Sequence, residues 1–415
     1  MTPLELHSLL QDGHPGALRL LSPLGRRAAM PLGIPQQSEQ ARGALRKATI
    51  GQITDGGGRP LALPSLVRHF SGFPDTSSLL YAPQYGLPAI RQAWRRHLAL
   101  PAGTPASVPV VASGITHGLS LCADMFTGPD VPVILGTPYW DNYDQIFTMR
   151  TGAPLVSYPF FGRDGRFNVE GLAARLDGTT GPALVLLNFP SNPTGYSPYP
   201  DEVAEIVRVL AAHPHPVCIV CDDAYNGLYF DPALYGKSLY AALATAVDPS
   251  RALVCKVDGA TKELVFFGGR IGFLTFSADG AAGQALAEKA AAILRGTVSS
   301  VSTPSQAAVL GALSSETLAA EHASVVGILA ERYVALRDSL AQSGLVALPF
   351  NSGCFALLPL PEGQDAEAMR QRLLKEQSVG VIAVPSANAL RIAFCSIEAA
   401  DIPDLVSRIV TGLRA

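Results

Sequence analysis

The sequence lacks the features that are typical of nucleic-acid-binding and membrane proteins. Its 415 residues carry a net charge of -3, so there is no positive excess to attract a polyanion or an anionic membrane surface. No uninterrupted apolar run is long enough to span a bilayer. The start, MTPLELHSLLQDGHPG, has no basic leader followed by a long apolar stretch, so we expect no secretion signal. We therefore expect a cytoplasmic protein that binds neither nucleic acid nor membrane.

Cysteine is also sparse, and its placement does not suggest a disulfide framework. Cys218 and Cys221 form a CxxC within VCIVC, but this segment is typical of a buried strand, where residues three apart face opposite sides. No second pair is present to complete a zinc site. We expect packed, unpaired cysteines and no bound metal. The six are Cys122, Cys218, Cys221, Cys255, Cys354 and Cys395.

Regular alternation of strands and helices dominates the middle of the chain. An apolar content of 48% with 16% charged residues is typical of a well-packed globular enzyme. The segment PDEVAEIVRVLAA places apolar residues on one helical face, after acidic residues at its start. Continuously apolar strands between helices predict an α/β fold with three layers, in which helices cover both faces of a mostly parallel sheet. The strand candidates are residues 108–111, 131–135, 183–188, 217–221, 252–257 and 271–276.

The two ends of the chain have a different pattern. The first 60 residues end in the Gly-rich TDGGGRP, and residues after about 310 form Ala- and Leu-rich helices followed by short apolar segments such as GVIAVP and ALRIAF. We predict a large domain at residues 61–310 and a small α+β domain formed by residues 1–60 and 311–415.

Ligands of parallel sheets bind at the carboxyl ends of the strands, and polar or aromatic residues follow each of them here. Ser113 and Gly114 precede a helix whose first turn is a potential anion site, although any strand-turn-helix junction uses such residues. Trp140, in GTPYWDNYDQIF, offers a flat surface for a ring, and core packing is the alternative. Asn192 lies in NPTG, which also suits a plain turn. Asp222 begins DDAY, directly after a buried strand.

Lys262, in DGATKELVFFGGRIG, lies between apolar segments in a chain with few lysines. A lysine in such a place must reach water, find a counter-charge or act as a neutral amine, because burying a bare ammonium is costly. Arg270 follows eight positions later. Lys256 is the nearest rival, but it has neither the preceding small residues nor an arginine at that spacing.

The order of these motifs resembles the fold-type I pyridoxal-phosphate enzymes of the class I/II aminotransferase family, from about Ile50 to the C-terminus. The resemblance implies pyridoxal 5′-phosphate as cofactor, with Lys262 forming the Schiff base and Asp222 on the ring nitrogen. It implies that Asn192 and Tyr225 bond the phenolic oxygen, that Trp140 stacks on the ring, and that the phosphate is bound by Gly114, Ile115, Thr116 and Arg270. Asp223 points the other way on the strand, so we expect it to be structural.

The same resemblance implies a homodimer with shared active sites and an α-amino acid substrate. Tyr81, in YAPQYGLP, is similar to the tyrosine that reaches the phosphate in the partner's site; a tyrosine packed before a turn is the alternative. Arg391, in LRIAF, matches the arginine that binds the substrate α-carboxylate; a structural ion pair is the alternative. Gly51 and Asn192 complete the expected substrate site.

Two departures from the family pattern limit what can be transferred. Gly259 lies where many relatives have a phosphate-binding serine, so Thr261 or Ser113 would have to help. The stretch GVIAVPSANALRIAF is shorter than the usual loop near the substrate. The expected reaction is amino transfer between an α-amino acid and a 2-oxo acid, with a lyase, decarboxylase or oxidase on the same fold as alternatives. A cofactor-binding regulator is disfavoured, because the first 60 residues contain no basic recognition helix.

Overall fold

The computed structural model of the protein describes residues 4, 5, 7, 8, 12, 21, 23–27, 33–56, 58–71 and 76–414. The expectation about an N-terminal leader falls mostly outside these residues, as does much of the expected contribution of residues 1–32 to the small domain.

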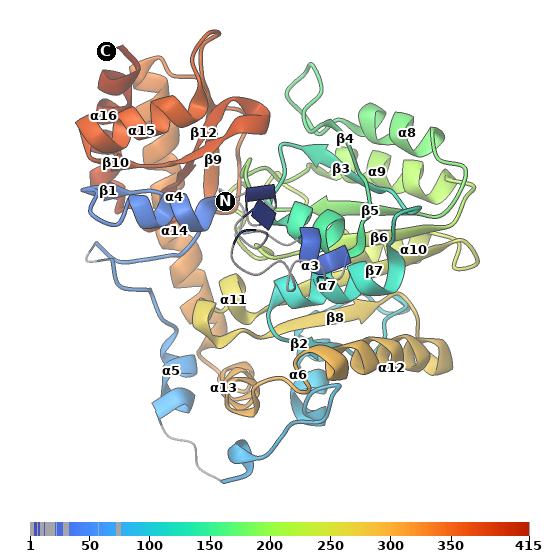
Figure 1. Ribbon diagram of the computed structural model, residues 1–415. Helices are drawn as coiled ribbons and strands as arrows, with labels where there is room; N and C mark the ends of the chain where they lie inside the picture. Colours follow the sequence, from blue (N-terminus) through green and yellow to red (C-terminus); the bar gives the residue numbers. More distant parts are fainter. Residues whose placement is uncertain are drawn as a thin grey trace.

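A seven-stranded sheet forms the centre of the larger part of the molecule (Figure 1). Strand β8 runs antiparallel to both of its neighbours, and the other adjacent strands are parallel. The predicted mostly parallel α/β sheet is therefore confirmed. In spatial order the strands are β2 (Val110–Ala112), β8 (Gly272–Phe276), β7 (Ala252–Gly259), β6 (Val217–Asp222), β5 (Ala183–Asn188), β3 (Val133–Thr137) and β4 (Leu155–Pro159).

Each of the six predicted strands overlaps an observed strand of this sheet, and only the edge strand β4 is missing from the prediction. Most of the side chains of β4 are half-buried, because β4 has a neighbour on one side only. Its sequence, LVSYP, is accordingly not the continuous apolar run that marks the central strands.

Helices cover both faces of the sheet, as predicted. Helices α7 (Ile115–Phe126) and α12 (Gly280–Thr297) lie on one face, and α8 (Val169–Asp177), α9 (Pro200–Ala212) and α10 (Tyr240–Ala246) lie on the other (Figure 1). Leu186 and Val220 pack into the core on the α7 side, and Val185 and Ile219 into the core on the α9 side. Side chains alternate between the two faces along a strand, and Asp222 lies two residues after Val220 in β6. Asp222 therefore points toward the α7 side, as Val220 does.

A smaller antiparallel sheet, with strand order β11-β12-β9, lies in the C-terminal part. Its strands are β9 (Phe355–Pro359), β11 (Ile382–Val384) and β12 (Ala389–Ala393), and α14 (Leu318–Ser343), α15 (Ala366–Gln377) and α16 (Ile402–Arg414) pack beside it. Residues 34–47 join this part, because β1 (Arg46–Lys47) pairs with β10 (Val379–Gly380) and α4 (Ile34–Gln40) packs on β11. The boundaries at residues 60 and 310 stay a prediction.

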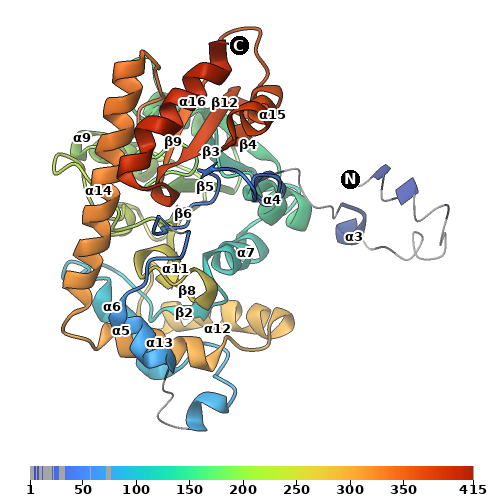
Figure 2. The same ribbon diagram turned by 90° about the vertical axis from the view of Figure 1, so that its left-hand side faces the viewer.

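The remaining helices surround these two sheets. Figure 2 shows α14 running from the group formed by α5, α6 and α13 to the C-terminal sheet. The helices are α3 (Pro23–Arg27), α5 (Pro64–Ser71), α6 (Pro88–His97), α11 (Ala260–Glu263) and α13 (Thr303–Leu313). Single turns occur at Thr76–Leu79, Asp144–Met149, Phe267–Gly269, Pro385–Ala387, Phe394–Ser396 and Ala399–Asp401.

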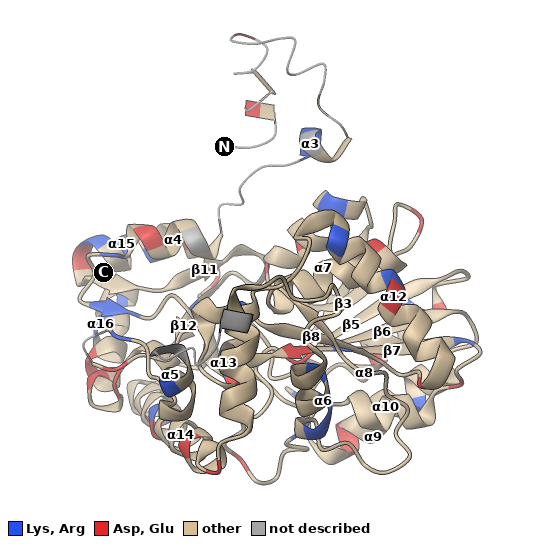
Figure 3. Ribbon diagram, turned by 90° about the horizontal axis from the view of Figure 1, so that it is seen from below, with Lys and Arg blue, Asp and Glu red and all other residues tan. Residues whose placement is uncertain are grey.

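The six cysteines are buried and free, and Cys218 and Cys221 pack into opposite cores, as their spacing predicts. Within the described ranges, no group of three or more His, Cys, Asp or Glu side chains is placed to hold a metal ion. None of the described helices is both long and apolar enough to cross a membrane. Acidic and basic residues are intermixed along the helices in Figure 3.

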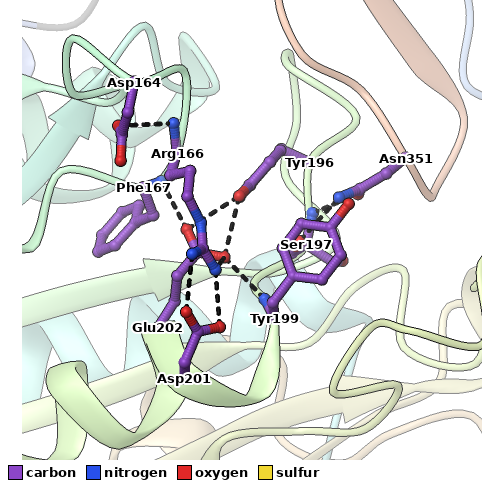
Figure 4. Close-up of polar contacts among 9 residues, drawn as sticks. All are labelled: Asp164, Arg166, Phe167, Tyr196, Ser197, Tyr199, Asp201, Glu202 and Asn351. Carbon is purple, nitrogen blue, oxygen red and sulfur yellow. Dashed lines mark hydrogen bonds and ion pairs between the residues drawn. The ribbon is translucent and has the colours of Figure 1, made fainter.

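A polar network fixes the chain where it enters α9 (Figure 4). The Glu202 carboxylate is buried and accepts hydrogen bonds from the backbone N–H groups of Tyr199 and Phe167, both at 2.7 Å. The Tyr196 hydroxyl donates to the same carboxylate at 2.9 Å. The backbone N–H of Tyr199, the residue before α9, thereby has an acceptor at a helix start, where N–H groups lack helical partners.

The same network connects the loop after β5 to the C-terminal part. Asn351 accepts from the Ser197 backbone N–H at 2.7 Å and donates to the Ser197 carbonyl at 2.9 Å (Figure 4). Because Ser197 lies five residues after Asn192, this pairing helps to fix the loop that contains a predicted site residue.

We predict that Glu202→Ala lowers the free energy of unfolding by roughly 3 kcal/mol, because it leaves buried N–H and O–H donors of Tyr199, Phe167 and Tyr196 without an acceptor. Asp201→Ala is the matched control: its carboxylate is exposed and binds Arg166 at the surface, so its removal should cost far less. Urea unfolding of both variants measures the difference, and equal losses would contradict the role of Glu202.

Candidate active site

A cavity of about 240 Å³ lies at the carboxyl ends of β5, β6 and β7. Ten of the twelve predicted site residues line it. Of the other two, Gly114 lies behind Arg270 and Tyr81 lies outside the cavity lining. The structure therefore brings together nearly all residues that were predicted from separate motifs.

Asp222 is buried at the end of β6 and faces the cavity. Burial raises the pKa of Asp222 to about 6, while a hydrogen bond from the Tyr143 hydroxyl, at 2.6 Å, and the charge of Lys262 oppose this rise. The Asn188 side chain donates to the Asp222 carbonyl at 2.9 Å. The site thus holds a rigid carboxylate suited to a cationic or N–H-bearing ligand group.

Asp223 faces away from the cavity, as predicted. Its carboxylate pairs with the buried Lys256 ammonium and accepts a hydrogen bond from the Ser238 hydroxyl at 2.6 Å. Lys256 also lies 3.2 Å from Asp258. The group is a buried ion cluster on the other side of the sheet, where removing one partner would leave an uncompensated charge.

The two lysines of this region have opposite electrostatic surroundings. Burial lowers the pKa of Lys262 and Arg270 lowers it further, although Asp222 raises it. Burial also acts to lower the pKa of Lys256, but Asp223 and Asp258 raise it above its ordinary value. Lys262, whose Nζ lies 5.1 Å from the centre of the Tyr225 ring, is therefore the amine that loses its proton more easily.

One end of the cavity is suited to an anion. Ile115 and Thr116 form the first turn of α7, where backbone N–H groups lack helical acceptors. Gly114 has a positive φ of 84°, and a Cβ there would lie 2.3 Å from Nη2 of Arg270, so only glycine lets the guanidinium approach. The Thr261 hydroxyl is buried without a partner among the described residues and also lines the cavity.

The departure at Gly259 has a steric reason. Gly259 pairs with Gly272 of β8, and a Cβ at Gly259 would lie 2.5 Å from the Ile271 carbonyl oxygen. A serine would not fit against β8 in this backbone. Thr261 is therefore the nearer candidate for the missing hydroxyl.

Aromatic side chains form the walls. Trp140 packs edge-on against Tyr143 with ring centres 5.5 Å apart, and Tyr225 packs edge-on against Phe355 at 5.4 Å. Trp140 and Tyr225 line the cavity, and burial raises the pKa of Tyr225 well above its ordinary value. The Tyr225 phenol is thus a neutral hydrogen-bond donor at neutral pH.

Arg391 lies in β12 and is 2% exposed. Its guanidinium donates to the Asn192 side-chain oxygen at 2.8 Å and to the Thr49 carbonyl at 2.6 Å, and it lies 4.3 Å from the centre of the Phe355 ring. Its Nε is buried without a partner among the described residues. Gly51 also lines the cavity, and a Cβ at this position would lie 2.5 Å from the Phe355 ring. A buried arginine with no carboxylate partner is a suitable anchor for a ligand carboxylate.

Tyr81 is 93% exposed, with Leu79 and Leu80 exposed beside it. The structure of a single chain thus does not bring Tyr81 to the cavity, and its predicted role across a dimer stays a prediction.

Two polar residues of the cavity lining, Tyr143 and Asn188, were not assigned a role from the sequence, although Tyr143 lies in the same aromatic segment as Trp140. Tyr143 bonds Asp222, and Asn188 bonds the Asp222 carbonyl while its side-chain oxygen accepts from the Asn192 N–H at 2.8 Å. Asn188 is the last residue of a predicted strand, and its position at the carboxyl end of that strand could have identified it as a candidate site residue.

The sequence model of the family "aminotransferase class I and II" matches residues 50–409, so the chain belongs to this family. An aspartate aminotransferase of Geobacillus stearothermophilus is 28% identical over 46% of this chain and 47% of its own length. A probable aspartate/prephenate aminotransferase of Thermus aquaticus is 28% identical over 74% of this chain and 75% of its own length. A 1-aminocyclopropane-1-carboxylate synthase of Oryza sativa subsp. japonica is 24% identical over 80% of this chain and 63% of its own length. Two of these three matches therefore span less than two thirds of the relative's own length.

Solved structures show the same fold. An aminotransferase from Anaerococcus prevotii superposes with a TM-score of 0.83 at 20% identity, covering 93% of this chain and 97% of that one. The cytoplasmic aspartate aminotransferase of Saccharomyces cerevisiae gives a TM-score of 0.76 at 20% identity, with the same coverage. The fold-type I architecture is thus established.

Enzymes of this family depend on pyridoxal 5′-phosphate, and the cavity fits this cofactor. The space in front of Gly114 and Arg270, with the unpartnered Thr261 hydroxyl, suits a phosphate. The Asp222 carboxylate, which lines the same cavity, suits a ring nitrogen that carries a proton.

We predict that Tyr143→Phe raises the pKa of Asp222 above about 6, because the lost hydrogen bond stabilises the charged carboxylate. The rise should be roughly one pH unit, since such a bond contributes about 1.5 kcal/mol. Carbon-13 NMR titration of the Asp222 carboxyl in cofactor-free protein measures it. Tyr139→Phe, whose hydroxyl contacts Asp144 instead, is the control and should leave Asp222 unchanged. An unchanged or lowered pKa in Tyr143→Phe would contradict the assignment.

Proposed function

We propose that the protein is a pyridoxal-phosphate-dependent aminotransferase that moves an amino group between an α-amino acid and a 2-oxo acid. The observation that carries the proposal is the single cavity that contains a lysine of lowered pKa, a buried carboxylate and a buried arginine without a carboxylate partner, namely Lys262, Asp222 and Arg391.

The cofactor is held at both ends. Ile115, Thr116 and Arg270 hold the phosphate, with Gly114 leaving room for the guanidinium. Asp222 holds the ring nitrogen in its protonated form, and Trp140 stacks on the ring. Asn192 and Tyr225 donate hydrogen bonds to the ring's phenolic oxygen. The bound cofactor supplies an electron sink for the carbanion that forms at the substrate α-carbon.

The substrate is held by the other side of the cavity. Arg391 binds the α-carboxylate in a bidentate manner, through a guanidinium that Asn192 and the Thr49 carbonyl already orient. Gly51, whose lack of a Cβ lets Phe355 pack close to the backbone, belongs to the same lining. Lys262 would hold the cofactor covalently and would move the substrate α-proton, a role that its lowered pKa favours because a general base works best near ambient pH.

A lyase is the second candidate. The rice relative is a 1-aminocyclopropane-1-carboxylate synthase, and the match to it covers 80% of this chain. The bond that breaks is determined by the pose of the substrate on the cofactor, so decarboxylase and oxidase chemistry are alternatives as well.

We propose that the enzyme acts as a homodimer with shared sites. The exposed run Leu79, Leu80 and Tyr81 supports this, because three adjacent large apolar side chains in water are typical of a surface that another chain covers. Tyr81 would then reach the phosphate in the partner's site. We also propose that the enzyme acts in the cytoplasm and binds neither nucleic acid nor membrane.

The amino-transfer reaction is tested with amino acids as donors and with 2-oxoglutarate and pyruvate as acceptors. We predict a new amino acid and the matching 2-oxo acid in equal amounts, and a loss of about 10²–10⁴-fold in kcat for Lys262→Ala, because the proton carrier is lost. Lys256→Met, assayed at equal folded fraction, is the control. Ammonia, carbon dioxide or peroxide without the paired products would assign the lyase, decarboxylase or oxidase reaction instead.

Mixed dimers test the shared site. Tyr81→Phe should weaken cofactor retention by about 1.5–3 kcal/mol, the contribution of one charge-assisted hydrogen bond. In a mixed dimer with Lys262→Ala, one site has both defects and the other has neither, so at limiting cofactor the activity should exceed the mean of the two parents.

The control mixture combines Lys262→Ala with Asp222→Asn. These residues lie in the same chain's cavity, so each site of that hybrid keeps one defect and no recovery is expected. Recovery in neither mixture after confirmed subunit exchange would count against Tyr81 crossing the interface.

A further inference from the structure

A second cavity, of about 280 Å³, adjoins the first and shares Trp140, Asn192 and Arg391 with it. A ligand whose carboxylate is bound by Arg391 can therefore extend into this space. Under the proposed function, on which this inference rests, the second cavity receives the side chain of the amino acid.

Two carboxylates, Asp141 and Asp144, line the second cavity. Asp141 follows Trp140 directly and Asp144 lies four residues after it, so the segment that carries the ring-stacking residue also carries these charges. Asp141 is half-buried and accepts only a long hydrogen bond, 3.4 Å, from the Ile34 backbone N–H, and the exposed Asp144 is 3.5 Å from the Tyr139 hydroxyl. Neither belongs to any ion pair among the described residues.

The two carboxylates repel each other. Burial raises the pKa of Asp144, and the charge of Asp141 raises it further. A cation placed between them would relieve this repulsion and gain attraction to both. Because Asp144 is exposed, an ammonium or guanidinium beside it would keep part of its hydration, so the cost of desolvation stays small.

The rest of the lining suits the methylene chain of such a substrate. Ile382 and Val384 supply apolar surface from β11, and Ile34 at the start of α4 adds to it beside Asp141. Tyr139 adds an aromatic face, which also attracts cations.

A substrate with a side-chain carboxylate fits poorly. Among the described residues that line the second cavity, Arg391 is the one lysine or arginine, and its guanidinium already serves the α-carboxylate. A second carboxylate would face Asp141 and Asp144 at a cost in repulsion. The names of two bacterial relatives refer to aspartate, a substrate class that this lining does not favour.

We infer that the amino donor is an α-amino acid with a cationic side chain, of the lysine, ornithine and arginine class, and that Asp141 and Asp144 recognise its distal charge. The second, independent observation is the buried and unpartnered Nε of Arg391, which lines both cavities and defines where the other end of this ligand is anchored.

The test compares lysine with norleucine, which has the same chain without the amine, and with glutamate. Each is mixed with the cofactor-loaded enzyme in a rapid-mixing experiment, and the change in the cofactor absorbance before the amino group is transferred gives the apparent dissociation constant. We expect lysine to bind at least about tenfold more tightly than norleucine, because one ion pair at a partly exposed site contributes about that factor in affinity. The lysine-to-norleucine ratio should fall about tenfold in Asp141→Asn and further in the double variant with Asp144→Asn.

Asp130→Asn is the matched control, because Asp130 is exposed just before the amino end of β3, at the opposite edge of the sheet from the cavities. It should leave the ratio unchanged. Tighter binding of glutamate than of lysine would overturn the inference, also where a cation from a partner subunit is the cause. A lysine preference that survives in the double variant would overturn it as well.

The binding measurement separates this inference from the proposed function. If lysine is preferred through Asp141 but no 2-oxo acid accepts the amino group, amino transfer is wrong and the side-chain assignment stands. If glutamate transfers its amino group efficiently and lysine does not, amino transfer stands and the side-chain assignment is wrong.

Discussion

The candidate site depends on the register of three parallel strands. Asn188 of β5 aligns with Asp222 of β6, and Asp222 aligns with Val257 of β7, so the three strands reach the same edge of the sheet together. The chain leaves each strand there and provides Asn192, Tyr225 and Lys262 within a few residues. A shift of one residue in β6 would turn Asp222 toward the α9 side and place Asp223 in the cavity. The hydrophobic cores on both faces prevent this shift, because every side chain of the strand would change its side.

The same alternation separates reactivity from stability. On the α7 side, Lys262 and Asp222 face a cavity in which burial lowers the pKa of the amine and raises that of the acid. On the other side, Lys256 and Asp223 are fully paired, and the amine keeps its proton. The two adjacent aspartates therefore have different surroundings because they face opposite sides of the sheet, and the two lysines differ because Lys256 lies in β7 and Lys262 in α11 beyond its end.

Much of this arrangement could be predicted from the sequence because it is local. The central strands are continuous apolar runs, α9 begins and ends where PDEVAEIVRVLAA does, and the site residues follow strand ends. The edge strand β4 lacks that pattern. The Tyr143 hydrogen bond to Asp222 joins residues 79 apart in the chain and depends on the packing of the segment after β3. The second cavity combines residues near 34, 141 and 382, and no local pattern encodes such a contact.

The central claim is that Lys262, and not Lys256, is the reactive lysine of this cofactor site. It is tested most directly by reducing the cofactor-loaded enzyme with borohydride and locating the modified lysine by peptide mass spectrometry. The account predicts one labelled peptide, containing Lys262, and loss of the label in Lys262→Ala but not in Lys256→Met. Label on Lys256, or no label on a protein that retains the cofactor, would contradict it.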